Sequence, residues 1–212
     1  MKYQAIIFDL DGVICHTDKY HYQAWKQLAN RLGIYFDEEI NNRLRGVCRM
    51  ECLEIVLERY NKKLTQDKKM SIAGEKNEIY KDLLKDMTPT DVSREVTNTL
   101  EILRDAGILL GIGSSSKNAK FILSKIGLEN FFDAVSDGVG LTNSKPDPEV
   151  FIKCAEMLGT PRAACLVVED AVVGVEAAKA AKMDSAAIGD AAKQDIATYN
   201  LKRFSELVAI CS

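Results

Sequence analysis

The spacing of hydrophobic positions differs between two parts of this chain. A short apolar run at residues 3–9 predicts a buried strand, because it is too brief for a helix. From residue 16 to residue 87 the apolar positions recur at helical spacing, and no segment has the pattern of a strand. After Pro89, helix and strand patterns alternate as far as Gly189. The sequence therefore predicts a helical segment inserted after the first strand of an alternating fold.

Glycines and capping residues mark where the predicted elements begin and end. Gly33 is a C-cap signal, Asp37 can cap the next helix, and Gly46 ends that helix. Further on, Ser93 can cap the first helix of the alternating part. The predicted helices cover residues 16–33, 37–45, 50–60, 71–84, 98–107, 119–127, 147–159 and 174–183. The later strands cover residues 108–116, 132–138, 164–170 and 184–189.

This alternation favours a parallel sheet with helices on both faces and right-handed crossovers. The predicted fold class is therefore α/β. Residues 1–15 and 88–212 would form the catalytic core, and residues 16–87 a helical cap domain. Because the insert leaves the core just after Asp11, we expect it to stand over the carboxyl end of the sheet as a lid.

Two carboxylates, Asp9 and Asp11, follow the first strand in the stretch FDLDGV. A lone Asp-x-Asp is more often a pair of solvated loop residues. Here the pair comes at the end of a buried strand, where open α/β sheets bind ligands. Buried carboxylates are costly unless they are paired or bind a metal, and two close together repel each other or require a cation. Gly12 then lets the chain turn away sharply.

The other predicted strands end on residues of matching chemistry. Strand 108–116 leads into short hydrogen-bonding side chains, which a turn capping the next helix explains equally well: Ser114, Ser115, Ser116 and Asn118. Strand 164–170 ends on Glu169 and Asp170, and Lys145, which alone would be solvated, precedes a proline-started helix. Four acids at one edge would suit Mg²⁺, and serine, lysine and backbone amides would suit a phosphate. One Asp could form an acyl phosphate while a second acid transfers protons.

Composition narrows the class of protein. The 212 residues have a formal net charge of −3, which gives no basic field for nucleic acid. No apolar run approaches the ~20 residues of a membrane span, and Asp9 interrupts the first one, unlike in a signal peptide. The six scattered cysteines lack a Cys-x-x-Cys spacing and the other ligands of a zinc site. We therefore expect a cytoplasmic, monomeric protein with reduced cysteines that binds neither nucleic acid nor membrane.

Taken in order, the motifs DLDGV, SSSKN, SKPDP and VEDAVVG resemble those of the haloacid dehalogenase-like superfamily. The stretches YHYQAWKQLA, LRGVCRMECL and EKNEIY of the predicted cap are most similar to its β-phosphoglucomutase branch. The resemblance covers about the first 190 residues. It departs at His16, where members usually carry Asp, and this adds an imidazole near the predicted site.

The resemblance implies a Rossmann-like core with a helical cap, and it implies roles for individual residues. Asp9 would be the phosphorylated nucleophile and Asp11 the general acid and base. Mg²⁺ would be held by Asp9, the backbone carbonyl of Asp11, Asp170 and Glu169. The implied substrate-binding residues are Thr17, His21, Trp25, Arg45, Gly46, Val47, Arg49, Lys76, Asn77, Ser114, Ser115, Ser116, Lys117, Asn118 and Lys145. Among these, Ser114 and Lys145 would hold the transferring phosphate.

The implied activity is that of a phosphomutase, which interconverts β-D-glucose 1-phosphate and D-glucose 6-phosphate through a glucose 1,6-bisphosphate. A Mg²⁺-dependent sugar-phosphate phosphatase of the same superfamily would use the same Asp9 and Asp11. A dehalogenase fits less well, because Asp11 would have no leaving oxygen to protonate. A non-catalytic phospho-acceptor domain is a third alternative, but it would lack the cap.

The first helix of the predicted cap partly supports these roles by itself. Thr17, His21 and Trp25 recur every four residues and so share one helix face, although core packing explains Trp25 equally well.

Arg49 lies near a helix start, where the helix dipole disfavours a cation. A bound anion would explain that placement, and an exposed loop arginine is the alternative.

Lys76 is unusual because of its neighbours. Ile72, Ile79 and Leu83 mark the expected apolar face of its helix, and Lys76 lies among them. Its ammonium group either reaches past this face to water or points into a polar cleft.

Overall fold

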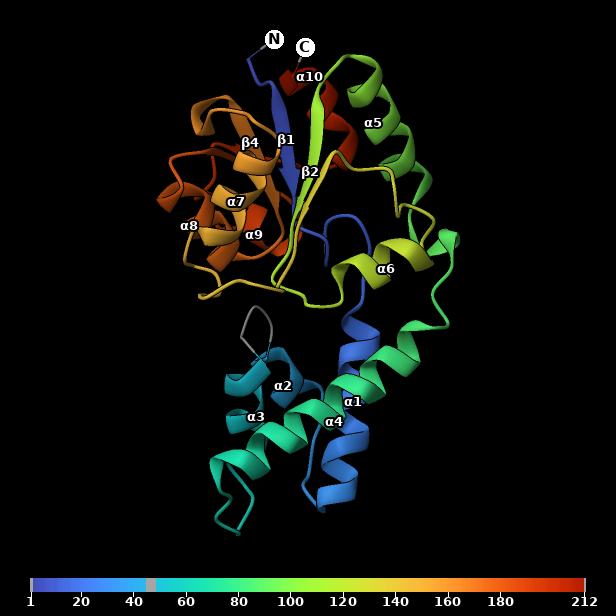
Figure 1. Cartoon of the computed structure of the whole chain (residues 1–212), viewed down its shortest axis with the longest axis vertical. Coiled ribbons are helices and arrows are strands. Elements are labelled where there is room, and N and C mark those ends of the chain that lie inside the picture. Colours follow the sequence, from blue (N-terminus) through green and yellow to red (C-terminus); the bar gives the residue numbers. More distant parts are fainter. Residues whose placement is uncertain (1, 45–48, 212) are drawn as a thin grey trace. The chain divides into compact units, whose positions relative to one another are not determined.

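The computed structural model describes residues 2–44 and 49–211 and divides the chain into two compact units (Figure 1). One unit comprises Met1–His16 and Met87–Ser212, and the other comprises Thr17–Asp86. The first contains the strands and the second is helical, so the predicted α/β fold class is confirmed. None of the helices in the described ranges combines the length and the apolar character that a membrane span needs.

Within the described residues, the core unit contains one parallel sheet of six strands. The strands are β1 Ala5–Phe8, β2 Leu109–Gly113, β3 Ala134–Ser136, β4 Cys165–Glu169, β5 Asp184–Ala187 and β6 Tyr199–Asn200. They lie in the order β3-β2-β1-β4-β5-β6, and each neighbouring pair is parallel. β1 therefore lies between β2 and β4, and the carboxyl ends of these three strands meet at one edge.

Helices cover both faces of this sheet, with α5 on one side and α7 and α8 on the other (Figure 1). The helices of the core unit are α5 Arg94–Asp105, α6 Ala119–Lys125, α7 Glu149–Met157, α8 Val172–Ala180, α9 Gly189–Ala192 and α10 Leu207–Cys211, with three 3₁₀ turns at Pro89–Asp91, Arg162–Ala164 and Phe204–Glu206. Successive side chains of β1 point to opposite faces. Ile7 packs with Val150 and Phe151 of α7, whereas the ring of Phe8 stacks on that of Phe204, 5.7 Å between centroids. Burial on both faces explains why this strand is a continuous apolar run.

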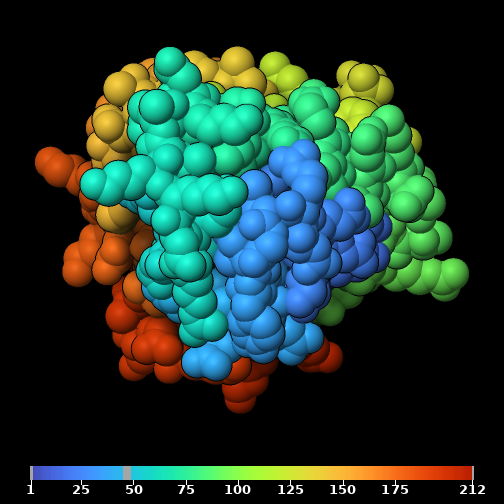
Figure 2. Space-filling model, turned by 90° about the horizontal axis from the view of Figure 1, so that it is seen from below, coloured from blue at the N-terminus to red at the C-terminus, as the bar shows by residue number. Residues whose placement is uncertain are grey.

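The helical unit contains α1 Asp18–Leu32, α2 Glu38–Asn42, α3 Arg49–Leu57 and α4 Gln66–Leu84. Figure 2 shows the surfaces of α1 and α4 lying side by side. Trp25, Leu28 and Leu53 belong to the apolar cluster that these helices enclose. Two predicted caps are present: Gly33 ends α1 with a left-handed φ of 70°, and the Asp37 carboxylate accepts the backbone N–H of Ile40 at 2.9 Å.

Two features of the helical unit differ from the sequence prediction. α4 begins at Gln66 rather than at residue 71, because the Thr65 hydroxyl accepts the N–H of Lys68 and caps the helix. Its buried face was assigned wrongly to Ile79 and Leu83, which are only half-buried. The buried positions are Ile72, Ala73, Lys76, Tyr80 and Leu84. Polar side chains occupy two of them, so a search for aliphatic residues alone missed the face.

The C-terminal part adds elements for which the sequence pattern gave no prediction. They are β6, which extends the sheet, and α10, which packs against α5. At the start of α5, the predicted cap is present, since the Ser93 hydroxyl accepts the N–H of Val96 at 3.2 Å. The described cysteines, residues 15, 52, 154, 165 and 211, are all buried, and none of them is part of a disulfide.

Candidate active site

The carboxyl edge of the sheet brings together residues that are far apart in the sequence. Phe8, the last residue of β1, is paired with Ile112 of β2 and with Val168 of β4. Asp9 follows directly, and its backbone N–H donates to the carbonyl of Val168 at 2.9 Å. The residues that end or follow β2 and β4 therefore flank Asp9, which is only 7% exposed.

Lys145 reaches this edge from the loop before α7. Its ammonium donates to Asp9 Oδ1 at 2.5 Å and also to Glu169 Oε1. The side chain is buried, and its ammonium lies over the ring of Phe151. Burial works against a charged lysine, but the two carboxylates outweigh it and raise the pKa of Lys145 above its usual value. The sequence left open whether this lysine is solvated, and the structure shows that it is not.

Both carboxylate oxygens of Glu169 accept hydrogen bonds. Its Oε2 accepts the backbone N–H groups of Asp170 and Ala171, both at 3.1 Å, while Oε1 accepts from Lys145. Gly174 of α8 lies so close that a Cβ there would overlap the carboxylate. Burial raises the pKa of Glu169 to about 7, with the negative charge of Asp9 adding to the effect and Lys145 opposing it.

Asp170 lies against the turn that follows β1. Gly12 has a φ of 83°, and a Cβ at this position would overlap the Asp170 carboxylate. The turn is closed by the Gly12 N–H, which donates to the carbonyl of Cys15 at 2.7 Å. Burial, together with the negative charges of Asp9 and Glu169, raises the pKa of Asp170 to about 8, and Lys145 opposes the rise. Because Gly12 has no side chain, the backbone next to Asp11 can lie close to the Asp170 carboxylate.

The donor set fits a magnesium ion. Among the described residues, no three His, Cys, Asp or Glu side chains gather as a site that could hold a metal by themselves. Mg²⁺ does not need such a cage, because it commonly keeps several waters and binds one or two carboxylates. Asp9 and Asp170 supply two carboxylates, and the backbone at Gly12 passes close to the carboxylate of Asp170. Burial is the main cause of the raised pKa of Asp170, and the negative charges of Asp9 and Glu169 add to it.

At the end of β2 the serines form a hydrogen-bonded turn. Ser114 is buried, and its hydroxyl accepts the N–H of Ser116 at 3.1 Å. The Ser116 hydroxyl in turn accepts the N–H of Asn118 at 3.2 Å. The turn precedes α6, whose N-cap residue Asn118 makes no side-chain capping hydrogen bond, so the predicted serine cap is absent. Ser114 directly follows β2, the neighbour of the strand that leads to Asp9. Ser115 and Lys117 are exposed, whereas Asn118 is buried.

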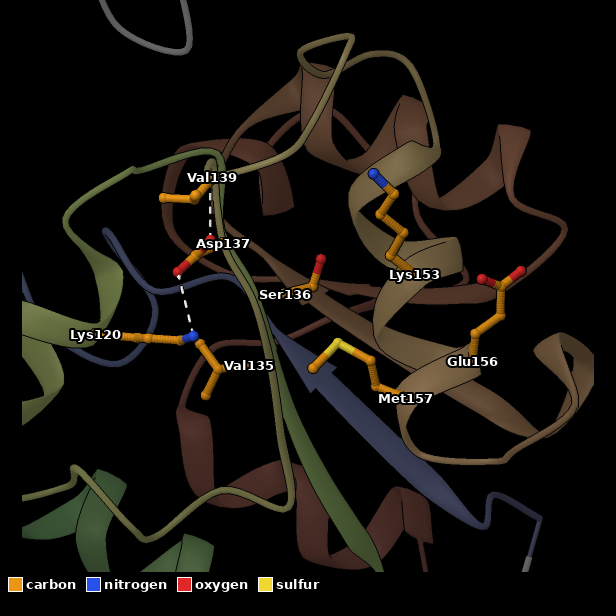
Figure 3. A pocket seen from close by; sticks show the side chains of 8 residues that line it. All are labelled: Lys120, Val135, Ser136, Asp137, Val139, Lys153, Glu156 and Met157. Carbon is orange, nitrogen blue, oxygen red and sulfur yellow. Dashed lines mark hydrogen bonds and ion pairs between the residues drawn. The ribbon is translucent and has the colours of Figure 1, made fainter.

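A hollow of about 510 Å³ lies outside this group, next to the edge strand β3. It is lined by Lys120, Ser136, Asp137 and Met157, among others (Figure 3). None of the predicted site residues lines it.

The helical unit contains a second polar group, centred on Lys76. This lysine is only 3% exposed, and its ammonium lies 2.7 Å from Nδ1 of His21. The ammonium also lies over the rings of Tyr80 and Trp25, 4.6 Å and 5.0 Å from their centroids. Lys76 therefore does not reach past the apolar face to water, and it packs among aromatic and polar side chains.

Burial in this group favours the neutral form of the His21 imidazole. Burial, with the nearby charges of Lys76 and Arg49, lowers the pKa of His21 well below its usual value. A neutral ring that accepts from Lys76 at Nδ1 carries its proton on Nε2, which is then a donor. Tyr80 stacks on this ring at 4.0 Å and donates its hydroxyl to Thr17 at 3.0 Å. Sequence reasoning missed Tyr80, although it lies four residues after Lys76 and so on the same helix face.

Arg49 is the first residue of α3 and is half-buried. Burial lowers the pKa of Arg49, with Glu78 opposing the effect. No hydrogen bond or ion pair joins its guanidinium to another residue in the described part of the chain. Asn77 is half-buried on α4, and His16 is exposed. The predicted site residues Arg45, Gly46 and Val47 lie outside the described residues.

Comparison with known proteins shows similarity over most of the chain. The profile of haloacid dehalogenase-like hydrolases matches residues 6–188. The β-phosphoglucomutase of Bacillus subtilis (strain 168) is 38% identical over 188 residues, which are 88% of this chain and 83% of the relative. Fructose-1-phosphate phosphatase YqaB of Escherichia coli (strain K12) is 30% identical over 184 residues, 87% of this chain and 95% of the relative. The crystal structure of a β-phosphoglucomutase from Clostridium difficile has a TM-score of 0.89 at 36% identity, and the match covers 97% of this chain and 93% of that one.

Proposed function

The chain belongs to the haloacid dehalogenase-like hydrolase family, and we propose that it acts within this family as a β-phosphoglucomutase. It would interconvert β-D-glucose 1-phosphate and D-glucose 6-phosphate through glucose 1,6-bisphosphate. The observation that carries the chemistry is Asp9, a buried carboxylate held at 2.5 Å by the ammonium of Lys145. The choice of mutase rests on the B. subtilis and C. difficile relatives.

The proposed reaction moves a phosphoryl group between a sugar oxygen and Asp9. A carboxylate oxygen of Asp9 attacks phosphorus, the bond from phosphorus to the sugar oxygen breaks, and an aspartyl phosphate forms. Asp11 gives its proton to the leaving sugar oxygen. In the reverse step, Asp11 takes a proton from the other sugar hydroxyl, which then attacks the aspartyl phosphate. Lys145 and Ser114 would hold the phosphate oxygens, and the ammonium would offset their charge.

A magnesium ion would be held by Asp9, the backbone carbonyl of Asp11 and Asp170. Glu169 would be a further ligand when Lys145 turns from it to the phosphate. When bound, the ion supplies positive charge that stabilises the transferring phosphoryl group.

The second phosphate of the bisphosphate needs its own cations. We propose Arg49 for this role, with Ser116, Lys117 and Asn118. A half-buried guanidinium at a helix N-terminus has an unfavourable position unless an anion lies beside it. His21 and Lys76, with the other predicted residues of the helical unit, would contact the sugar phosphate.

The dependence of stability on pH tests the magnesium site. Without metal, the pKa of Asp170 is about 8 and that of Glu169 about 7, well above unfolded values near 4. Between about pH 4 and pH 8 the unfolded chain thus binds fewer protons than the folded one, so the metal-free protein loses stability as pH rises. We expect Mg²⁺ to raise the melting temperature more at about pH 8 than at about pH 5.5. Asp170→Ala should remove most of this rise, and an equal rise at both pH values would contradict the site.

Arg49→Ala tests the second phosphate site. If Arg49 binds the distal phosphate, its loss should lower mutase kcat/KM by about 10², the effect of a charge-assisted contact worth ~3 kcal/mol. Hydrolysis of p-nitrophenyl phosphate, which has one phosphate, should be nearly unchanged. Arg43→Ala is the matched control, because Arg43 is an exposed arginine of the same unit that pairs with Glu58. An equal fall in both activities would mean that Arg49 supports structure instead.

A sugar-phosphate phosphatase is the second candidate, favoured by the 30% identity to the E. coli fructose-1-phosphate phosphatase. The two differ in whether water or a sugar hydroxyl accepts the phosphoryl group from Asp9. The test is incubation with β-glucose 1-phosphate, Mg²⁺ and a trace of glucose 1,6-bisphosphate, followed by assay of glucose 6-phosphate and inorganic phosphate. Release of inorganic phosphate without formation of glucose 6-phosphate would contradict the proposed mutase activity and support the phosphatase.

A further inference from the structure

The loop that carries Lys145 is fastened by a side chain of the helix that follows it. Glu149 is the first residue of α7. Its Oε2 accepts the backbone N–H groups of Thr142 and Asn143, both at 2.9 Å. Its Oε1 accepts the ammonium of Lys153, one turn further along α7, at 2.6 Å. Oε2 therefore holds the segment that leads to Lys145, and Oε1 holds Lys153 of the same helix.

Lys153 provides a second link between α7 and this loop. Besides pairing with Glu149, its ammonium donates to the carbonyl of Gly140 at 2.7 Å. In Figure 3 the Lys153 side chain extends from α7 away from Met157. The hydrogen bond from Lys153 lowers the pKa of Glu149, and the N–H of Asn143 adds to this effect. The Glu149 carboxylate therefore stays charged. The clamp, defined as the Glu149 and Lys153 side chains, thus binds the loop at three backbone positions.

On the other side of Lys145 the loop is also fixed. The Asp147 N–H donates to the carbonyl of Ser144 at 3.0 Å, and the Asp147 carboxylate accepts the N–H of Glu149 at 2.9 Å. Lys145 is therefore the long, flexible side chain of an otherwise restrained loop. Its ammonium must meet both Asp9 and Glu169, and this requires the loop backbone to be in place.

We propose that Glu149 and Lys153 are positioning residues for Lys145. The inference rests on the proposed phosphoryl transfer, since Lys145 matters there by holding the nucleophile and the phosphate. Small displacements of a catalytic group cost large factors in rate, and residues that fix its support set its precision. Among the described residues, no hydrogen bond or ion pair joins Glu149 or Lys153 to Asp9 or Glu169, so their effect must pass through the loop.

Hydrogen exchange tests the clamp without any reference to activity. Glu149→Ala removes both acceptor oxygens, and Glu149→Gln keeps one. We expect amide exchange in the segment 140–147 to be about tenfold or more faster in Glu149→Ala and intermediate in Glu149→Gln. Glu156→Gln is the matched control, because Glu156 is an exposed acid of the same helix whose side chain lies 3.9 Å from Arg162. Unchanged exchange in both Glu149 variants would overturn the proposal.

Kinetics then test whether the clamp acts through Lys145. We expect kcat of Glu149→Ala to fall about tenfold or more, with KM within about threefold and with Glu149→Gln in between. Because Lys145 serves both reactions, mutase activity and p-nitrophenyl phosphate hydrolysis should fall together. Faster exchange with a kcat equal to that of Glu156→Gln would show that the loop does not position Lys145. If the native protein transferred no phosphoryl group at all, the proposed function would fail, whereas faster exchange in the variants would still support the clamp.

Discussion

Asp9→Asn is expected to keep the fold and to abolish turnover, with kcat lower by about 10⁴ or more. An amide has no anionic oxygen with which to attack phosphorus, so no acyl phosphate can form. The fold should survive because the link from residue 9 to β4 is made by its backbone N–H and the carbonyl of Val168. An asparagine oxygen can also still accept a hydrogen bond from Lys145. Stopped-assay measurement of glucose 6-phosphate, with circular dichroism of the variant, checks both parts.

The control for this prediction is Asp105→Asn, which makes the same change at an exposed position in α5. It should retain full activity. If Asp9→Asn kept even a tenth of the native kcat, which is an effect of only ~1.4 kcal/mol, Asp9 could not be the nucleophile.

The grouping of acids at the sheet edge was open to prediction because it depends on the backbone. In the structure β1 and β4 are parallel neighbours, with Phe8 paired to Val168, and this pairing brings together the ends of the two strands. Each strand is a short apolar run that ends on an acid, and this is a pattern that the sequence displays directly. The same pattern placed Ser114 at the end of strand 108–116, and the structure shows that this strand, β2, is a neighbour of β1.

The contacts of loop side chains could not be predicted from the spacing of hydrophobic residues. Nothing in the stretch SKPDP tells whether Lys145 points to solvent or to Asp9, because a loop has no repeating face. The clamp of Glu149 and Lys153 is similarly hidden, since three of its hydrogen bonds are to the backbone groups of a loop. Such contacts depend on tertiary packing, which the local spacing of hydrophobic residues does not record.

The buried face of α4 shows the same limit inside a helix. Aliphatic residues alone favoured a face through Ile79 and Leu83, but the structure buries Lys76 and Tyr80. These two are tolerated there because His21 and Thr17 on the facing segment receive their hydrogen bonds. A polar residue can therefore be assigned to the buried face of a helix only when its hydrogen-bond partner on the facing segment is known.

Lys145→Met is expected to lower both activity and stability. Methionine has a similar length and no charge, so two buried carboxylates, Asp9 and Glu169, lose the cation between them. Removal of one partner from a buried ion pair costs about 3–5 kcal/mol of the free energy of unfolding. Without the ammonium to offset charge on the phosphoryl group, kcat should fall by about 10³ or more.

The stability loss in Lys145→Met should depend on pH, and this separates charge removal from general damage to packing. Lys145 opposes the rise in the pKa of Glu169, so its loss raises that pKa further above the unfolded value. The folded variant then holds extra protons at neutral pH, and its deficit in stability grows as pH rises from about 5 to about 8. Urea unfolding in EDTA at the two pH values measures this, with Lys120→Met, a change at an exposed lysine of the same unit, as the control. A deficit that is equal at both pH values would attribute the loss to packing, and Lys145 would then not be the cation that balances this edge of the sheet.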